Sequence, residues 1–441
     1  MGVKYYVVGG YVRDKILGFT PKDSDFVVVG ADPCYMLELG FKLVGRDFGV
    51  FIHPVTGDEY ALARVERNVS QGYKGFECTW EGVTLEDDLA RRDLTINSMA
   101  MEVEVYRDGS FNIIGDIIDL FGGVGDVHRK FIRHTTEAFK EDPVRLLRIA
   151  RLLARYGDSW KVVPSTIKIL DELKLSGELN HLVPERVWLE TEKALGTKNP
   201  SIYFTFLQKY NVLGDNVKGM QNTIEHNIHH PEENVWEHVS MVMDYAAQTY
   251  RDPEINFACF MHDFGKEYCY TIYGKGHGHE NEGLPYIEEF CDKFKVPNRY
   301  RDLALLVCEH HQRVHASLGR GANKGMSPKS IMNLFEKTKA EVKSARFEKI
   351  LKCCIADSKG RGLSVSEEYT LTKEYFLDKH YHQADYLLEC LQAVKSVDTK
   401  EISGKLLSNG KSGQVIGLEI RAAKIYAIRG VYNEWKGKEL L

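Results

Sequence analysis

The first third of the chain alternates short runs of β-branched and aromatic residues with turn-forming residues. This alternation is typical of short β-strands that belong to one sheet. Strands are predicted at 5–8, 26–29, 60–63 and 101–105. The dipeptide Asp108-Gly109 separates the last of these from an apolar run at 111–114, and this spacing predicts a hairpin.

Helical patterns interrupt this sheet and later replace it. Helices are predicted at about 11–17, ended by Gly18, and at about 85–99. After residue 141 strand patterns nearly vanish, and apolar residues recur at intervals of three and four, as on one face of a helix. We therefore predict an α+β fold, in which an N-terminal mixed sheet with helices precedes a mostly helical remainder.

Composition narrows the class of protein. The 441 residues suggest about two to four domains, and 43% apolar with 27% charged residues is typical of globular proteins. No apolar run reaches the roughly 18 residues that span a membrane, so we expect a cytoplasmic protein without a membrane partner. The nine cysteines include no Cys-x-x-Cys pair, which argues against a disulfide framework or zinc ribbon. With a net charge of −5, the protein as a whole has no electrostatic field that attracts nucleic acid. Any contact with RNA therefore requires a local basic face.

Two short segments near the N-terminus suggest a site for phosphates and metal ions. Gly9 and Gly10 follow a strand and open a helix, so their amides can approach an anion that Arg13 also reaches. Asp23 and Asp25 precede the next strand, where alternate residues share a face and two carboxylates can hold Mg²⁺. Each motif alone has an ordinary explanation, as a tight turn or a strand cap. Their combination in one β-α-β unit favours the phosphate-and-metal site.

Arginines mark two later segments. Arg92 follows a helix start at which Thr84 and Asp87 have capping-box spacing, and nothing local explains this arginine. A helix predicted after Pro143 carries arginines within an arc of roughly 120° that contains no acidic residue: Arg145, Arg148, Arg151 and Arg155. A solvated face normally mixes both signs, so we interpret this one as a basic binding face.

These motifs, in this order, resemble those of the class II tRNA nucleotidyltransferases, which include CCA-adding enzymes and bacterial poly(A) polymerases. The matching segments are 9–14 with 22–25, 86–97, 141–145 and 148–155. Leu94 and Ser98 depart from the residues usual in the family but leave the charged motif intact.

The resemblance implies transfer of nucleotides from ATP and CTP to tRNA with Mg²⁺ as cofactor. Asp142 and Arg145 would select the base, because a carboxylate accepts from the exocyclic amine of C or A while a guanidinium donates to the neighbouring ring atom. The family pattern assigns Asp23 and Asp25 as catalytic metal ligands, and Gly10, Arg13, Arg92, Asp142, Arg145 and Arg148 as nucleotide-binding residues. We expect Arg151 and Arg155 to bind tRNA.

A second cluster lies in the C-terminal half, where histidines gather between His226 and His315. The segment 259–266 resembles the signature of HD-domain metal phosphohydrolases, in which imidazoles and carboxylates from several helices bind a divalent ion. A metal-bound hydroxide can hydrolyse phosphoesters such as 2′,3′-cyclic phosphates. The implied ligands of a transition metal or Mg²⁺ are His238, His262, Asp263 and Asp357, with His279 and His311 as second-metal or supporting groups. We expect His226, His229 and His230 on the surface.

Together the two halves resemble bacterial CCA-adding enzymes that carry a C-terminal HD domain. We predict a catalytic head at 1–138, a neck with the template and RNA-binding residues at 139–225, an HD domain at 226–360 and a helical tail at 361–441. The expected function is addition of C, C and A to the 3′ end of tRNA by a monomer or homodimer. The residues leave open a poly(A) polymerase, an enzyme adding only CC or A, and an HD phosphohydrolase with a nucleotide-sensing N-terminal domain.

Overall fold

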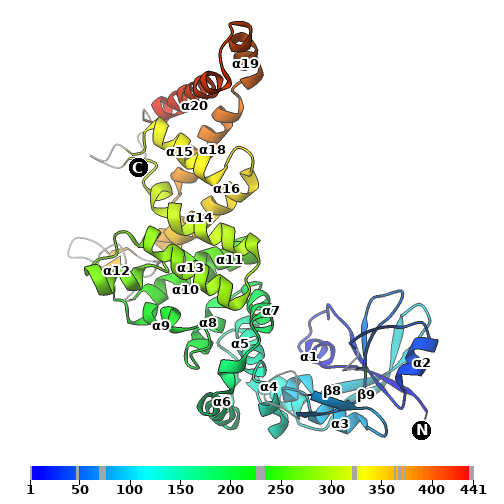
Figure 1. Cartoon of the computed structure of the whole chain (residues 1–441). Helices are drawn as coiled ribbons and strands as arrows, with labels where there is room; N and C mark the ends of the chain where they lie inside the picture. The colour runs from blue at the N-terminus through cyan, green and yellow to red at the C-terminus, as the bar shows by residue number, and fades with distance from the viewer. Residues whose placement is uncertain are drawn as a thin grey trace. The chain divides into compact units, whose positions relative to one another are not determined.

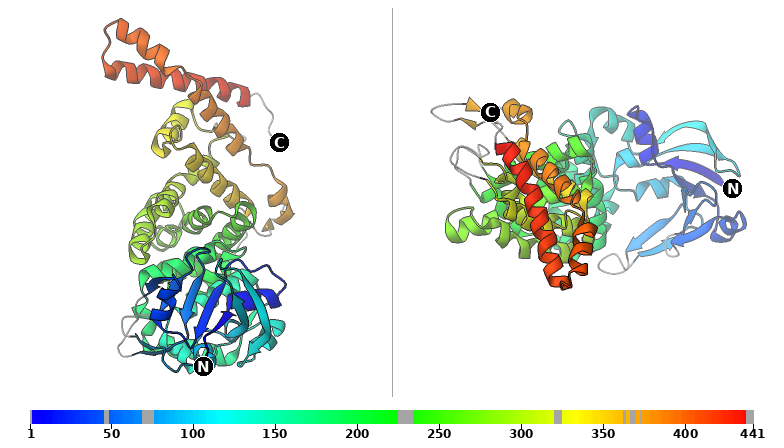
Figure 2. Two further views of the ribbon diagram at one scale, coloured as in Figure 1. Left: turned by 90° about the vertical axis from the view of Figure 1, so that its right-hand side faces the viewer. Right: turned by 90° about the horizontal axis from the view of Figure 1, so that it is seen from above.

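The computed structural model describes residues 2–45, 49–68, 76–224, 234–319, 325–361, 364–365, 370–371 and 373–436. The chain forms two compact units, Met1–Glu190 and Thr191–Leu441, and the boundary falls within helix α7. Figure 1 and Figure 2 show the strands of the first unit in blue to cyan and the helices of the second unit in green to red. The predicted α+β class, with a mixed sheet followed by a mostly helical remainder, is confirmed.

The first unit contains a mixed seven-stranded sheet in the order β3-β4-β5-β2-β1-β8-β9. Two separate pairs are formed by β6 with β7 and by β10 with β11. The strands are β1 Lys4–Val8, β2 Asp25–Val29, β3 Lys42–Gly45, β4 Val50–Ile52, β5 Glu59–Leu62, β6 Val65–Asn68, β7 Phe76–Thr79, β8 Met99–Val105, β9 Phe111–Asp119, β10 Phe131–Ile132 and β11 Lys161–Val162. The helices are α1 Gly10–Ile16, α2 Pro33–Glu38, α3 Leu85–Ala90, η2 Thr95–Asn97, α4 Gly123–Arg129, η3 Glu137–Glu141, α5 Arg145–Tyr156, α6 Pro164–Ser176, η4 Glu178–His181 and α7 Pro184–Leu195.

Both faces of the sheet hold the central strand β2 in place. β2 pairs antiparallel with β1 and parallel with β5. Successive side chains of a strand point to opposite faces. Phe26 stacks on Tyr60 with ring centroids 4.3 Å apart, whereas Val27 belongs to a hydrophobic cluster with Leu89 of α3. Because both faces are buried, the register of β2 is fixed, and so is the position of Asp25 at its start.

The strands predicted around this centre and the first helix are confirmed as β1, β2, β5, β8 and α1. Gly18 follows the end of α1 with a φ of 74°, a conformation that glycine adopts without strain. The predicted hairpin joins β8 to β9, and Gly109 in its turn has a φ of 84°.

The helix predicted at about 85–99 is wrong in its second half. Helix α3 ends at Ala90, a short 3₁₀ turn follows, and residue 99 already begins β8. The Asp93 carboxylate accepts hydrogen bonds from the Leu94 amide and the Asn97 side chain. Such side-chain bonds compete with helical ones and provide an alternative path for the backbone.

The described residues of the second unit are helical apart from one short pair of strands and the connecting segments. Its elements are α8 Pro200–Gln208, α9 Asp215–Asn222, α10 Val235–Tyr250, α11 Pro253–Met261, α12 Lys266–Tyr273, α13 His279–Phe294, α14 Asn298–His315, α15 Pro328–Thr338, α16 Ser344–Lys359, β12 Ser364–Val365, β13 Thr370–Leu371, α17 Lys373–Asp378, α18 His382–Lys395, α19 Thr399–Ser408 and α20 Gly413–Lys436. Helices α10, α11, α14 and α16 pack on one another, while α20 packs on α15, α18 and α19 (Figure 1). In the part of the chain that the structure describes, no helix is long and apolar enough to cross a membrane.

Candidate functional site

The turn between β1 and α1 lies beside the start of β2. Val8, which precedes Gly9, opposes Asp25 in the antiparallel register of β1 and β2. Helix α1 begins at Gly10, and Asp23 lies two residues before β2; the side chains of both aspartates are exposed. The fold therefore brings the predicted phosphate-binding turn and the predicted metal carboxylates to the same end of two adjacent strands.

Glu59 adds a third carboxylate at this end of the sheet. It opens β5 and opposes Asp25 in the parallel register of β2 and β5. Partial burial and the nearby Asp25 carboxylate raise the pKa of Glu59 above its ordinary value. A divalent cation relieves such repulsion, so the pair suits a metal site. Nothing in the local sequence marks Glu59, because only the pairing of two distant strands places it there.

Arg13 lies within a buried network at the start of α1. Its guanidinium donates to Asp14 Oδ1 at 2.8 and 3.0 Å and to the side-chain oxygen of Asn97. Arg155 of α5 donates to the other oxygen of Asp14 at 2.7 Å. A Cβ at Gly10 would lie 3.5 Å from Arg13 Nη2, so the guanidinium is a direct neighbour of the turn. The network therefore fixes the direction of Arg13 before any ligand arrives.

Arg92 approaches the same turn from the segment after α3. A Cβ at Gly9 would lie 3.2 Å from Arg92 Nη1. The Arg92 guanidinium donates to Asp88 Oδ2 at 3.1 and 3.2 Å, while Arg91 donates to Asp88 Oδ1. Burial opposes the ionisation of Asp88, but Arg91 and Arg92 outweigh burial and hold its pKa below the ordinary value. Asp88 therefore orients Arg92 beside the glycines.

The arginines of α5 all contact groups from other elements. Arg148 donates to buried Asp93 at 2.6 Å. Burial opposes the ionisation of Asp93, but Arg148 outweighs it and holds the Asp93 pKa well below its ordinary value. The other partners are Glu190 for Arg151, Asp14 for Arg155, and the backbone carbonyls of Ala138 and Arg91 for Arg145. The helix presents one basic face as predicted, but carboxylates from distant segments neutralise much of it.

Asp142, the predicted base-reading carboxylate, is held by Arg186 of α7. Two parallel bonds join them: Arg186 Nη1 donates to Oδ1 at 3.0 Å and Nη2 donates to Oδ2 at 2.7 Å. The Val144 amide also donates to Oδ1 at 3.2 Å. A carboxylate has about four acceptor positions, so Oδ2 retains capacity for a further donor. Arg186 and Glu190 were not predicted, although their spacing of four places both on one face of α7.

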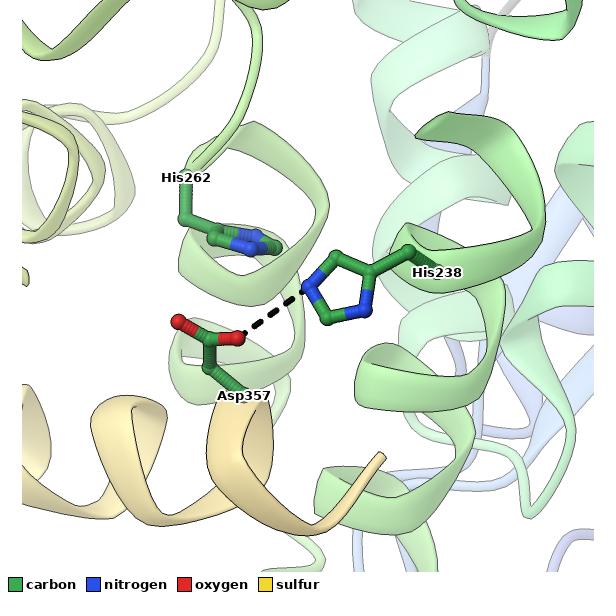
Figure 3. A group of neighbouring side chains, drawn as sticks. All are labelled: His238, His262 and Asp357. Carbon is green, nitrogen blue, oxygen red and sulfur yellow. Dashed lines mark hydrogen bonds and ion pairs between the residues drawn. The ribbon is translucent and has the colours of Figure 1, made fainter. Parts of the chain in front are cut away.

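In the second unit, three buried residues from three parts of the chain form a candidate metal centre (Figure 3). His238 lies on α10, His262 follows the end of α11, and Asp357 lies on α16. His238 Nε2 is 3.1 Å from Asp357 Oδ1, and the His262 ring lies next to both side chains. One ligand atom from each residue lies within 4.8 Å of the others. The structure thus brings together three of the predicted ligands.

Asp263 connects this centre to a second group of ligands. Asp263, His279 and His311 also place ligand atoms within 4.8 Å of one another. Asp263 Oδ1 is 3.1 Å from His279 Nε2 and 3.6 Å from His311 Nε2. The other oxygen, Oδ2, is 3.1 Å from His262 Nε2 and 2.9 Å from Lys266 Nζ. Since one oxygen faces each group, Asp263 has the geometry of a bridging carboxylate.

Hydrogen bonds on the far side of the rings orient the histidines for metal binding. In His262, His279 and His311 the Nδ1 atom lies 2.7 to 2.9 Å from a backbone carbonyl, which can only accept, so Nδ1 donates and Nε2 points inward. Metal-binding histidines are commonly held in this way. His262 Nε2 is buried and makes no hydrogen bond with the residues that the structure describes. The donor set therefore fits a divalent ion.

Electrostatics favour the metal-binding protonation state of Asp263, Asp357 and His311, whereas Asp263 outweighs burial and raises the pKa of His279. Burial opposes the ionisation of Asp263 and Asp357, but neighbouring histidines, with Lys266 for Asp263, lower both pKa values well below the ordinary one. Burial and the adjacent His279 lower the pKa of His311 to about 3. Ionised carboxylates and neutral imidazoles are the ligating forms. The histidines expected at the surface, His226, His229 and His230, lie outside the described residues.

Comparisons with known proteins identify a family for each of two parts of the chain. The Poly A polymerase head domain family matches residues 5–133, and the HD domain family matches residues 235–347. The Multifunctional CCA protein of Haemophilus influenzae (strain PittGG) is 39% identical over 442 residues, which cover 97% of this chain and 98% of that protein. The chain belongs to the multifunctional CCA protein family. The family member from Tolumonas auensis is 38% identical and covers 99% of this chain and 100% of its own length.

Solved structures of CCA-adding enzymes share the fold. The Bacillus stearothermophilus CCA-adding enzyme in complex with CTP has a TM-score of 0.61 at 19% identity, covering 97% of this chain and 89% of that one. The Thermotoga maritima CCA-adding enzyme complexed with tRNA has a TM-score of 0.54 at 18% identity, covering 98% and 90%. Membership of the family and the two matched domains mark the chain as a tRNA nucleotidyltransferase with an HD domain.

Proposed function

We propose that the chain adds C, C and A to the 3′ end of tRNA from CTP and ATP without a nucleic-acid template. We also propose that its HD domain hydrolyses phosphoesters, including 2′,3′-cyclic phosphates. The observation that carries the first activity is the register of β1 and β2, which sets the Gly9-Gly10 turn beside Asp25. Structural neighbours are complexes with tRNA, CTP and ATP, and these are the partners we propose.

Nucleotide transfer requires a site that binds a triphosphate beside carboxylates. Asp23 and Asp25, with Glu59 at their side, would hold Mg²⁺, which activates the RNA 3′ hydroxyl and offsets charge on the departing phosphates. The 3′ oxygen attacks the α-phosphorus, the bond to the bridging oxygen breaks, and pyrophosphate leaves. Gly10 at the start of α1, with Arg13 beside it and Arg92 beside Gly9, positions the triphosphate through N–H groups.

Base selection rests on residues before and within α5. Asp142 Oδ2, oriented by Arg186, accepts from the exocyclic amine of C or A, and Arg145 donates to the adjacent ring atom. U and G present a carbonyl in place of the amine, and that carbonyl cannot donate to a carboxylate. Arg148 also contacts the nucleotide. Its pairing with Asp93 fixes the guanidinium before the nucleotide binds.

The HD chemistry follows from the ligand groups in the second unit. His238, His262, Asp263 and Asp357 would hold one divalent ion, and His279 and His311 could support it or, with Asp263, hold a second ion. When bound, such ions supply a hydroxide nucleophile and neutralise charge on the phosphate. The imidazole-rich set favours a transition metal over Mg²⁺.

The remaining parts of the proposal concern organisation. We place the catalytic head at 1–138, the neck at 139–225, the HD domain at 226–360 and the tail at 361–441. Arg151 and Arg155 bind tRNA at the neck. We place the enzyme in the cytoplasm, where it acts as a monomer or homodimer.

Extension of a tRNA transcript that lacks its terminal CCA tests the first activity. The transcript is incubated with Mg²⁺ and labelled nucleotides, singly and together, and the products are separated at single-nucleotide resolution. We expect addition to stop after C, C and A. A long A tract would indicate a poly(A) polymerase, and arrest after CC or addition of A alone would indicate a partial activity. If no nucleotide is added but phosphoesters are hydrolysed in the presence of metal, the N-terminal domain would be a nucleotide sensor.

A further inference from the structure

A third group of metal-ligating side chains lies outside both sites, where α18 begins. His380, His382 and Asp385 each offer one ligand atom, and these atoms lie within 4.8 Å of one another. His380 Nε2 is 2.5 Å from Asp385 Oδ2, and the rings of His380 and His382 have centroids 4.5 Å apart. Two imidazoles and one carboxylate form a common three-ligand set for zinc and related divalent ions.

Local backbone geometry brings these three side chains together. His380 and His382 flank Tyr381, whose φ of −100° and ψ of 80° keep the backbone out of the helical region, and alternate residues of such a segment share a side. Asp385 lies three residues after His382, so both occupy one face of the first helical turn. Trp435 of α20 supports the His382 ring, with ring centroids 6.3 Å apart.

A surface ion pair accounts for His380 and Asp385 but not for His382. The side chains of His380 and Asp385 are 64% and 47% exposed, and exposed pairs of this kind contribute little to stability. Exposure also leaves an open approach for an ion with water as its remaining ligands. The neighbouring cation Lys379 is directed to the Tyr375 hydroxyl at 3.4 Å, where it contacts a group outside the ligand set.

Tyr381 connects this group to the HD centre. Tyr381 is buried, and its hydroxyl is 2.7 Å from His315 Nδ1. On the other ring nitrogen, His315 Nε2 is 2.6 Å from Asp357 Oδ2. An ion bound by the residues on both sides of Tyr381 would restrain its backbone, and therefore the hydroxyl that contacts His315 beside Asp357.

We propose that His380, His382 and Asp385 form a divalent transition-metal site that holds the start of α18 and positions Tyr381 against His315. This site is separate from the two catalytic centres and shares no ligand with them. Metal binding here is independent of the proposed activities, because it requires neither nucleotide nor phosphoester. Only the effect on Asp357, which His315 contacts, depends on the proposed function of the HD domain.

Zinc stoichiometry tests the binding site directly. Full-length protein is stripped of metal and titrated with Zn²⁺ by calorimetry, as wild type and as the double variant His380→Ala/His382→Ala. Because the side chains changed are not buried, we expect the double variant to fold normally and to bind about one Zn²⁺ fewer per chain. His128→Ala, which removes an exposed histidine elsewhere, is the matched control and should retain the wild-type stoichiometry. Equal stoichiometry in the wild type and the double variant would overturn the proposal.

A second variant distinguishes zinc bound at this site from zinc bound at the HD centre. In the background His262→Ala/Asp263→Ala each of the two HD ligand groups loses one ligand, and we expect about one Zn²⁺ to remain bound at the start of α18. Amide hydrogen exchange then tests whether Zn²⁺ restrains the backbone around Tyr381. Exchange across 379–386 should become several-fold slower when Zn²⁺ is added to the wild type, and it should stay unchanged in His380→Ala/His382→Ala. Zinc bound without such protection would refute the positioning role. Failure of phosphoester hydrolysis would count against the proposed HD function and leave this outcome unaffected.

Discussion

Replacement of Arg186 should weaken base selection without touching any residue assigned to the nucleotide. Arg186 holds Asp142 through two parallel hydrogen bonds of 3.0 and 2.7 Å. In Arg186→Ala the carboxylate loses both guanidinium bonds and keeps its bond from the Val144 amide, so it can rotate away from the exocyclic amine of the base. In Arg186→Lys the charge remains but the planar fork is lost, and we expect an intermediate defect.

The structure sets the size of this effect. Hydrogen bonds to charged groups are worth about 1.5–3 kcal/mol, but the Arg186 and Asp142 side chains are 27% and 17% exposed, so solvent screening reduces the loss of stability to about 1–2 kcal/mol. One well-placed base contact discriminates by about 1–3 kcal/mol, which corresponds to about 5- to 150-fold. Selection for CTP over UTP should therefore fall by roughly that factor.

The assay compares kcat/KM for CTP and UTP on tRNA lacking CCA, with wild type, Arg186→Ala and a control. Arg107→Ala removes an exposed arginine from the turn between β8 and β9 and should leave the ratio unchanged. Thermal unfolding confirms that both variants are folded under the assay conditions. A wild-type CTP to UTP ratio in folded Arg186→Ala would refute the idea that Arg186 orients Asp142 for base reading.

Three further predictions concern the HD centre. A Cβ at Gly265 would lie 2.3 Å from His279 O and 2.6 Å from Gly283 N, so Gly265→Ala should cost about 1–3 kcal/mol and displace His279; wild-type unfolding and hydrolysis would contradict this packing argument. In metal-free protein, burial lowers the His311 pKa to about 3 against about 6.5 when unfolded, so the unfolded chain binds more protons between these values and stability falls as the pH drops below 6.5, by about 1.4 kcal/mol per pH unit. The denaturation midpoint of His311→Gln should therefore fall less than that of wild type between pH 7 and 5.5, and parallel pH profiles would disprove this role. Chelation should abolish phosphoester hydrolysis, and added Mn²⁺, Co²⁺ or Ni²⁺ should restore it in wild type but not in Asp357→Ala; recovery in the variant would exclude Asp357 as a ligand.

Local hydrophobic patterns correctly predicted strands whose side chains are buried in a simple way. The continuous apolar run Phe26 to Val29 predicted a strand, and β2 forms there with both of its faces buried. The prediction that the helix continues beyond Ala90 was wrong, because the Asp93 side chain accepts hydrogen bonds from Leu94 and Asn97. Hydrophobic periodicity does not reveal such bonds between polar groups.

The same limit applies to the sites. The resemblance of residues 259–266 to the HD signature supplied the ligand set His238, His262, Asp263 and Asp357, and the structure brings these side chains close together. Glu59 required the pairing of β2 with β5, and Arg186 required the approach of α7 to Asp142. These contacts join residues far apart in the chain, so no local window contains them.

A tRNA that lacks CCA and ends in a 2′,3′-cyclic phosphate tests most directly the claim that one chain carries two metal-dependent sites. Because its 3′ oxygen is esterified, it cannot attack a nucleotide until the phosphate is removed. Wild type with Mg²⁺, a transition metal, CTP and ATP should hydrolyse the cyclic phosphate to a monoester, hydrolyse that monoester to release phosphate and free the 3′ hydroxyl, and then add CCA.

Two variants divide this sequence of reactions. Asp25→Asn should process the cyclic end and add nothing, whereas Asp357→Ala should leave the cyclic end intact yet extend a matched tRNA with a free 3′ hydroxyl. The account is contradicted if Asp357→Ala extends the cyclic-phosphate tRNA as well as wild type does, or if Asp25→Asn adds nucleotides to either substrate.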